Sequence, residues 1–171
     1  AKLIDELGVS YIEGGWPGAS PKEEEFFEIA KKELNLKNAK LVSFGSTRKL
    51  NLSAKDDPQV KALVDSGTDY VCIVGKSSNL HITKALQTDV DSAIEMAVDT
   101  ILYLKSKGKK VFFDAEHFFD GYKEDSETSL KILESVVTAG ADCFIFCDTN
   151  GGTLPEEVRK ILSEVIENYP K

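Results

Sequence analysis

Short apolar runs rich in β-branched and aromatic residues recur along the chain. They cover residues 9–13, 40–46, 69–75, 110–116 and 142–148. Each run has the length and composition of a β-strand. Their first residues are 29 to 41 positions apart, which is the length of one strand-plus-helix unit.

Amphipathic patterns with helical spacing separate these runs. They cover residues 21–34, 57–65, 89–107, 125–139 and 155–168. Ser20 followed by Pro21 is a typical helix start, and Gly8, Gly67 and Gly140 each follow a helix end. Strands that alternate with helices predict a parallel α/β sheet covered by helices.

Two architectures satisfy this alternation. One is a partial (β/α)8 TIM barrel of about five β/α units, and the other is a complete doubly wound sheet of the flavodoxin type. Residues 1–7 resemble the second half of a helix without a cap, and the chain stops directly after a helix. We therefore expect residues 1–171 to be a partial barrel domain, truncated at both ends.

Polar residues and glycines concentrate where the predicted strands end. In parallel α/β folds the carboxyl ends of the strands carry the active site, so we interpret this side of the sheet as an active face. The residues that mark it are Glu13, Arg48, Lys76, His81, Asp114, Glu116, His117, Asp148 and Thr149.

Structural roles compete with this interpretation at several positions. Glu13, Asp114 and Asp148 are also suitable helix caps, and His81 is also suitable as a hydrogen-bonded loop histidine. Lys76 fits a Schiff-base lysine, a solvated lysine or one that faces a phosphate. Phe118 and Phe119 are expected to pack rather than to bind a substrate. A metal cluster of Asp114, Glu116, His117 and Asp120 matches no closed zinc pattern.

Composition and charge exclude several partner classes. The net charge is −8, which argues against nucleic acids and anionic membranes as partners. No apolar run approaches the ~18 residues of a membrane helix, and no signal peptide is visible. The three cysteines, Cys72, Cys143 and Cys147, form no C-x-x-C pair, which is typical of reduced thiols in the cytoplasm.

Four of the strand-end segments together resemble a known family. They are Tyr-Ile-Glu-Gly-Gly-Trp-Pro-Gly at 11–18, Phe-Gly-Ser-Thr-Arg at 44–48, Asp-Ala-Glu-His-Phe-Phe-Asp-Gly-Tyr at 114–122, and Cys-Asp-Thr-Asn-Gly-Gly-Thr-Leu-Pro at 147–155. The chain resembles the catalytic barrel of the HMGL-like enzymes, from strand two to the helix after strand six. This family includes citramalate, 2-isopropylmalate and homocitrate synthases and hydroxymethylglutaryl-CoA lyase. The first and third segments favour the citramalate synthases.

The resemblance implies both a fold and an acyltransferase reaction. The fold is a TIM barrel, and the reaction is a Claisen condensation of acetyl-CoA with pyruvate followed by thioester hydrolysis. The alternatives within the family are isopropylmalate and homocitrate synthases, which use another α-keto acid. A divalent metal (zinc, manganese or magnesium) polarises the keto acid, and a base deprotonates the acetyl methyl group.

The resemblance also assigns residues. Glu116 and His81 are expected to be catalytic, and Thr149 is expected to bind the keto-acid carboxylate. Glu13 and Arg48 lie where strand-end residues of the family approach the substrate. Asp114, which shares a strand face with Glu116, completes the predicted substrate-binding set.

The family's metal ligands have no counterpart in this sequence. They are an aspartate in an Arg-Asp-Gly segment and a His-x-His pair, on strands one and seven. We therefore expect no metal ligands within the chain, and no activity of the 171 residues by themselves. Open sheet edges predict a homo-oligomer. The competing hypothesis from another class is a noncatalytic flavodoxin-like module that binds a regulator or anion.

Overall fold

The computed structural model describes residues 1–169 and contains one five-stranded sheet. The strands are β1 (Tyr11–Gly15), β2 (Lys40–Ser46), β3 (Tyr70–Lys76), β4 (Lys110–Glu116) and β5 (Cys143–Phe146). The helices are α1 (Lys2–Asp5), α2 (Pro21–Glu33), α3 (Pro58–Asp65), α4 (Asn79–His81), the π-helix η1 (Ile82–Leu86), α5 (Val90–Ser106), α6 (Phe118–Glu124), α7 (Ser126–Thr138) and α8 (Pro155–Asn168).

The order of the strands decides between the two architectures. All four pairings are parallel, and the order in the sheet is β1-β2-β3-β4-β5. A flavodoxin-type sheet has the order 2-1-3-4-5, so that alternative is wrong. Strands that stay in chain order, each followed by a helical segment, are the pattern of a β/α barrel.

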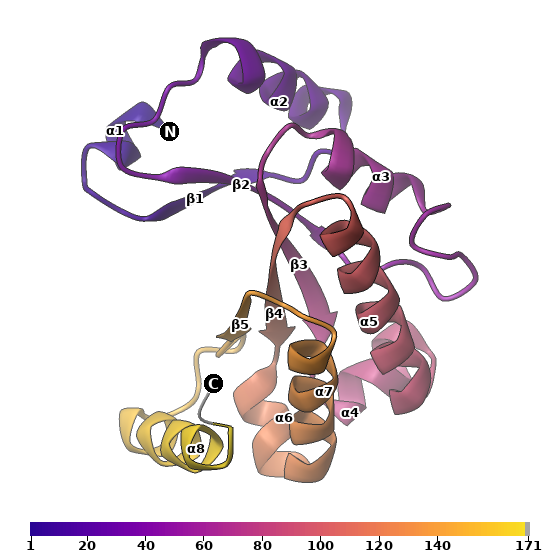
Figure 1. Ribbon diagram of the computed structural model, residues 1–171. Coiled ribbons are helices and arrows are strands. Elements are labelled where there is room, and N and C mark those ends of the chain that lie inside the picture. The colour runs from indigo at the N-terminus through magenta and orange to yellow at the C-terminus, as the bar shows by residue number, and fades with distance from the viewer. Residues whose placement is uncertain (170–171) are drawn as a thin grey trace.

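The sheet is curved, and the main helices follow its convex side (Figure 1). Alternate residues of β3 and β4, such as Val71, Ile73, Val111 and Phe113, are buried against these helices in the main core. The opposite, concave face carries a smaller cluster built around Val42, Cys72 and Phe112. The two-residue repeat of each strand therefore separates a packed face from a face that carries the polar strand-end residues.

Helix starts follow the expected local chemistry. Ser20 accepts a hydrogen bond from the Glu23 backbone N–H at 3.3 Å, and Pro21 is the first helical residue of α2. Asp57, Asp89 and Asp125 cap α3, α5 and α7 in the same way. These side chains satisfy N–H groups that have no partner within the helix.

The glycines at the helix ends adopt the expected conformation. Gly8, Gly67 and Gly140 have φ values of 78°, 81° and 93°. These angles lie in the left-handed region, which glycine enters without the steric cost that a side chain adds.

Three short helices occupy segments that we expected to be loops. They are α4, η1 and α6, of which the longest has seven residues. Two turns contain too few residues to show a helical repeat in sequence. Phe118 and Phe119 of α6 are 0% and 3% exposed, so the expectation that they pack is confirmed.

Three strands differ from their expected limits. β1 covers Tyr11–Gly15 instead of 9–13, β3 covers Tyr70–Lys76 instead of 69–75, and β5 covers Cys143–Phe146 instead of 142–148. No helix within residues 1–169 is long and apolar enough to span a membrane.

Candidate active site

Glu116 lies at the carboxyl end of β4, at the centre of the polar strand ends. Its neighbour across the sheet is Lys76, the last residue of β3, and the two side chains form an ion pair. Both side chains are about one-quarter exposed, at 26% and 25%. The carboxylate is therefore partly desolvated, accessible to a small molecule and held by a cation in a fixed place.

The backbone at Glu116 is fixed from the β3 side. The Ser77 backbone N–H and hydroxyl both donate to the Glu116 carbonyl oxygen, at 3.2 and 2.7 Å. Ser77 is fully buried, and its own carbonyl accepts a hydrogen bond from Ser129 of α7 at 3.0 Å. These contacts leave little freedom for the strand end that carries the carboxylate.

Thr149 follows β5 and lies beside the same strand end. Its Oγ1 accepts a hydrogen bond from the His117 backbone N–H at 2.8 Å. A hydroxyl group has one proton to donate. Because the His117 N–H uses it as an acceptor, the hydroxyl proton of the exposed Thr149 remains free to be donated to an incoming anion.

The imidazole rings of His81 and His117 stack on each other. Their centroids are 3.7 Å apart and the ring planes differ by 4°. Burial, followed by the proximity of His117 and Lys76, lowers the pKa of His81, although Glu116 and Asp120 oppose this change. His81 is therefore a neutral imidazole near pH 7, which can donate or accept a proton.

Glu13, Cys72 and Asp114 form a second cluster on the concave face, one donor atom from each lying within 4.8 Å of the others. Burial, and then the charge of Asp114, raises the pKa of Glu13. Burial also raises the pKa of Asp114, with a further contribution from Glu116. Desolvation strongly raises the pKa of the fully buried Cys72 thiol.

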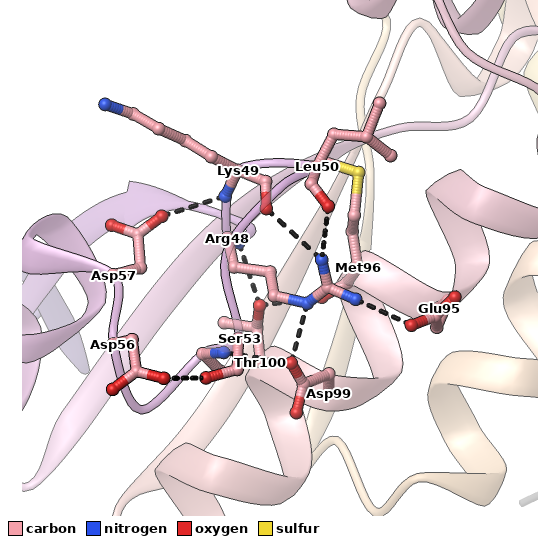
Figure 2. A network of polar contacts seen from close by, with 11 residues as sticks. Arg48, Lys49, Leu50, Ser53, Asp56, Asp57, Glu95, Met96, Asp99 and Thr100 are labelled. Carbon is pink, nitrogen blue, oxygen red and sulfur yellow. Dashed lines mark hydrogen bonds and ion pairs between the residues drawn. The ribbon is translucent and has the colours of Figure 1, made fainter.

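Arg48 does not join either cluster. Its side chain is 7% exposed and pairs with Asp99 at 2.6 Å and Glu95 at 2.9 Å, both on α5 (Figure 2). The guanidinium also donates to the carbonyls of Lys49 and Leu50, at 3.2 Å each. These contacts tie the loop after β2 to the helix layer and occupy the donors that a substrate would use.

The structure thus sorts the candidate residues into groups. Glu116, His81 and Thr149 lie around one strand end, whereas Glu13 and Asp114 meet lower on the concave face. Asp148 ties its own loop by accepting hydrogen bonds from the hydroxyl and N–H groups of Thr153, at 2.9 and 3.2 Å.

Lys76 and His117 are among the residues that mark the active face in the sequence, but the family resemblance assigns neither of them a role. The alternation of side chains along β3 indicates that Lys76 lies on the same face as Cys72. It does not indicate that Lys76 pairs with Glu116. Nothing in the sequence indicates that His117 stacks on another ring. Nothing indicates either that its backbone is left-handed, with a φ of 58°.

A curved sheet of sequential parallel strands, with a carboxylate, an imidazole and a hydroxyl group at its carboxyl edge, is the arrangement of a β/α-barrel enzyme. The comparisons with known proteins specify this class further. Residues 1–171 match the HMGL-like family, and the chain belongs to it.

The curated relatives include several (R)-citramalate synthases. The enzyme of Aquifex aeolicus is 50% identical over 169 residues, which cover 99% of this chain and 32% of the relative. The enzyme of Sulfolobus acidocaldarius is 46% identical, over 98% of this chain and 32% of the relative. A homocitrate synthase of the same organism is 28% identical, over 99% of this chain and 34% of the relative. The chain spans about a third of the length of these relatives.

A solved structure supports the fold. The hydroxymethylglutaryl-CoA lyase of Bacillus subtilis matches with a TM-score of 0.75 at 16% identity, over 98% of this chain and 56% of the other. The partial TIM-barrel architecture is therefore confirmed.

Enzymes of this family are metal-dependent. Within residues 1–169, Glu13, Cys72 and Asp114 are the one group of three donors close enough to share a cation. This group offers two carboxyl groups and a thiol but no imidazole, so its donors do not match the aspartate and paired histidines that the family resemblance implies. We derive no catalytic step through a metal at this cluster.

Proposed function

We propose that this chain is a part of the catalytic barrel of a citramalate synthase, which condenses acetyl-CoA with pyruvate. The observation that carries the proposal is the grouping of Glu116, His81 and Thr149 around one strand end. The higher identity to citramalate synthases than to the homocitrate synthase supports pyruvate as the keto acid. A cytoplasmic location is proposed with it, which the three free cysteines support.

Glu116 is proposed as the acid–base group of the reaction. Its carboxylate is accessible, and the Lys76 ion pair fixes its direction. A general base must reach the proton that it removes, and a partly desolvated carboxylate at a strand end satisfies this requirement. His81, as a neutral ring, is proposed to exchange a proton with the oxygen that becomes the alkoxide.

Thr149 is proposed to bind the carboxylate of the keto acid. The Thr149 oxygen already accepts a hydrogen bond from the His117 N–H. Its hydroxyl proton is therefore available for donation to the carboxylate of the keto acid. Glu13 and Asp114 are proposed to line the lower part of the substrate pocket, where burial raises both pKa values and disfavours the charged forms. Arg48 is proposed to hold the loop after β2 instead of the substrate.

A divalent metal, when bound, supplies a Lewis acid for the keto group. We propose that residues outside this chain bind it, since the curated relatives are about three times as long. The 171 residues alone are then expected to bind keto acid weakly and not to turn it over. Homo-oligomerisation is proposed for the whole protein.

The test is an assay of the protein that the whole reading frame encodes. With pyruvate and acetyl-CoA, release of free CoA should be detected by a thiol reagent, and Glu116→Gln should reduce kcat about 100-fold or more. Blanks without acetyl-CoA correct for Cys143 and Cys147, which are accessible to the reagent. Faster turnover of a branched or longer α-keto acid than of pyruvate would contradict the choice of substrate.

The fragment provides its own test. Turnover of pyruvate and acetyl-CoA by residues 1–171 alone would overturn the proposal that essential groups lie elsewhere.

A further inference from the structure

His117 directly follows the proposed base Glu116 and contacts the neighbouring site groups on both sides. Its ring stacks on His81, which follows β3. Its backbone N–H donates to Thr149, which follows β5. Within residues 1–169, no other residue forms a hydrogen bond or a ring stack with both of these side chains.

The backbone of His117 is held in an uncommon conformation. Its φ and ψ are 58° and 33°, in the left-handed region, where residues other than glycine are rare. Surrounding structure must maintain such a conformation, and conformations of this kind cluster at functional sites. α6 begins at the next residue, and the Phe118 N–H donates to the Cys147 carbonyl at 3.2 Å, so the turn is fixed on its far side.

α6 is itself packed tightly against the end of β3. A Cβ atom at Gly121 would lie 2.6 Å from the Ser77 carbonyl oxygen and 2.8 Å from the Ser78 Cα. This close approach lets the segment that contains His117 reach the segment that contains His81. The Nδ1 atoms of both rings are buried and form no hydrogen bond, so the stack itself is the main contact between them.

We propose that His117 is a positioning residue of the site: its ring, stacked on His81, sets the plane and the surroundings of that imidazole, while its N–H occupies the Thr149 oxygen and leaves the hydroxyl proton for a ligand. One residue thereby aligns the groups on both sides of Glu116. The effect of His117 on catalysis rests on the proposed function, whereas its effect on His81 and Thr149 does not depend on that function.

The physical basis is that two imidazolium rings repel each other when they stack. A positive charge on the His117 ring therefore disfavours a proton on His81. The charges that act on His81 are those of His117, Lys76, Glu116 and Asp120. The carboxylate of Asp120 lies 3.7 Å from His117 Nδ1 and also accepts a hydrogen bond from Asn150 at 2.7 Å.

The test uses NMR titration of the 171-residue chain, which contains only these two histidines. In the unmodified chain, we expect cross-peaks between the two rings and a His81 titration that departs from a single-site curve. In His117→Asn, which tolerates the left-handed backbone and keeps the N–H, the pKa of His81 should rise. Thr149→Val is the matched control, and it should leave the His81 titration unchanged.

A second variant separates stacking from charge. His117→Phe keeps an aromatic ring without a proton, so the His81 curve should become single-site. An unchanged His81 pKa in His117→Asn, or a single-site curve without ring contacts in the unmodified chain, would overturn the proposal. If a variant fails to fold, the ring contacts and the His81 titration of the unmodified chain still support or overturn the proposal.

Activity provides a separate readout in the protein that the whole reading frame encodes. His117→Asn should move the acidic limb of its kcat/KM profile to higher pH, because His81 then protonates earlier. No condensation by the unmodified protein would refute the proposed function while leaving the NMR result intact.

Discussion

At the scale of single residues, the alternation of side chains along a strand predicted which candidate residues share a face of the sheet. Asp114 and Glu116 were expected to share one face of β4, and the structure places both on the concave side. Arg48 follows the end of a strand, where alternation no longer applies, and its direction depends on acids of α5 that are more than 40 positions away. The proposed role of His117 depends on the stacking of two rings from different segments. A single sequence does not indicate such a contact.

Asp114 allows a pH test at this scale. Its ordinary pKa is 3.8, and burial raises it in the folded state. The folded chain therefore binds more protons than the unfolded chain from about that pH up to the raised value, so this group makes the protein less stable as pH rises through the window. Asp114→Asn should thus gain unfolding free energy relative to the unmodified chain as pH rises from acid to neutral.

Urea unfolding of both proteins at pH 4 and pH 7 measures this difference. The comparison is made between variants because carboxylates with lowered pKa values, such as Asp125 and Asp142, give the whole chain an opposite pH trend. A stability difference that is the same at both pH values would contradict the expectation.

At the scale of elements, the long helices and the strands were predictable because each repeats its pattern several times. The helices α4, η1 and α6 were not, because packing determines them more than periodicity does. α6 shows this clearly: two buried phenylalanines anchor it, and Gly121 allows its backbone to touch the end of β3.

Gly121→Ala tests that contact. The new methyl group would meet backbone atoms of Ser77 and Ser78, which cannot rotate away. We expect a loss of about 1–3 kcal/mol in unfolding free energy, measured by urea denaturation. Gly152→Ala is the matched control, since a Cβ atom there has no neighbour within 4 Å. Equal stability of the two variants would show that the contact carries no strain.

At the scale of the whole molecule, the sequence predicted β/α units but left the strand order open. Order is a property of pairing between segments, and both candidate architectures contain the same alternation. In the described residues, β1 and β5 each have one strand neighbour. The concave face between them carries aromatic residues, among them Tyr11, whose ring lies 5.3 Å from that of Tyr70 and 4.9 Å from that of Phe112.

The exposed aromatic face predicts self-association of the 171-residue chain. Tyr11 is 48% exposed on an edge strand, where a charged residue opposes pairing with another copy. Tyr11→Lys should shift the sedimentation profile towards the monomer. Leu102→Lys, at a residue that is 53% exposed on α5, is the control and should leave the profile unchanged. A monomeric unmodified chain would contradict the expectation.

The sequential order of the strands also has a consequence for how the chain folds during synthesis. Each strand pairs only with the strand before and the strand after it, and successive strands begin 29 to 40 residues apart. Every pairing in the sheet therefore closes a short loop, which keeps the entropic cost of folding low. The sheet can grow one unit at a time as the chain leaves the ribosome, with β1 and β2 paired before β5 has been translated.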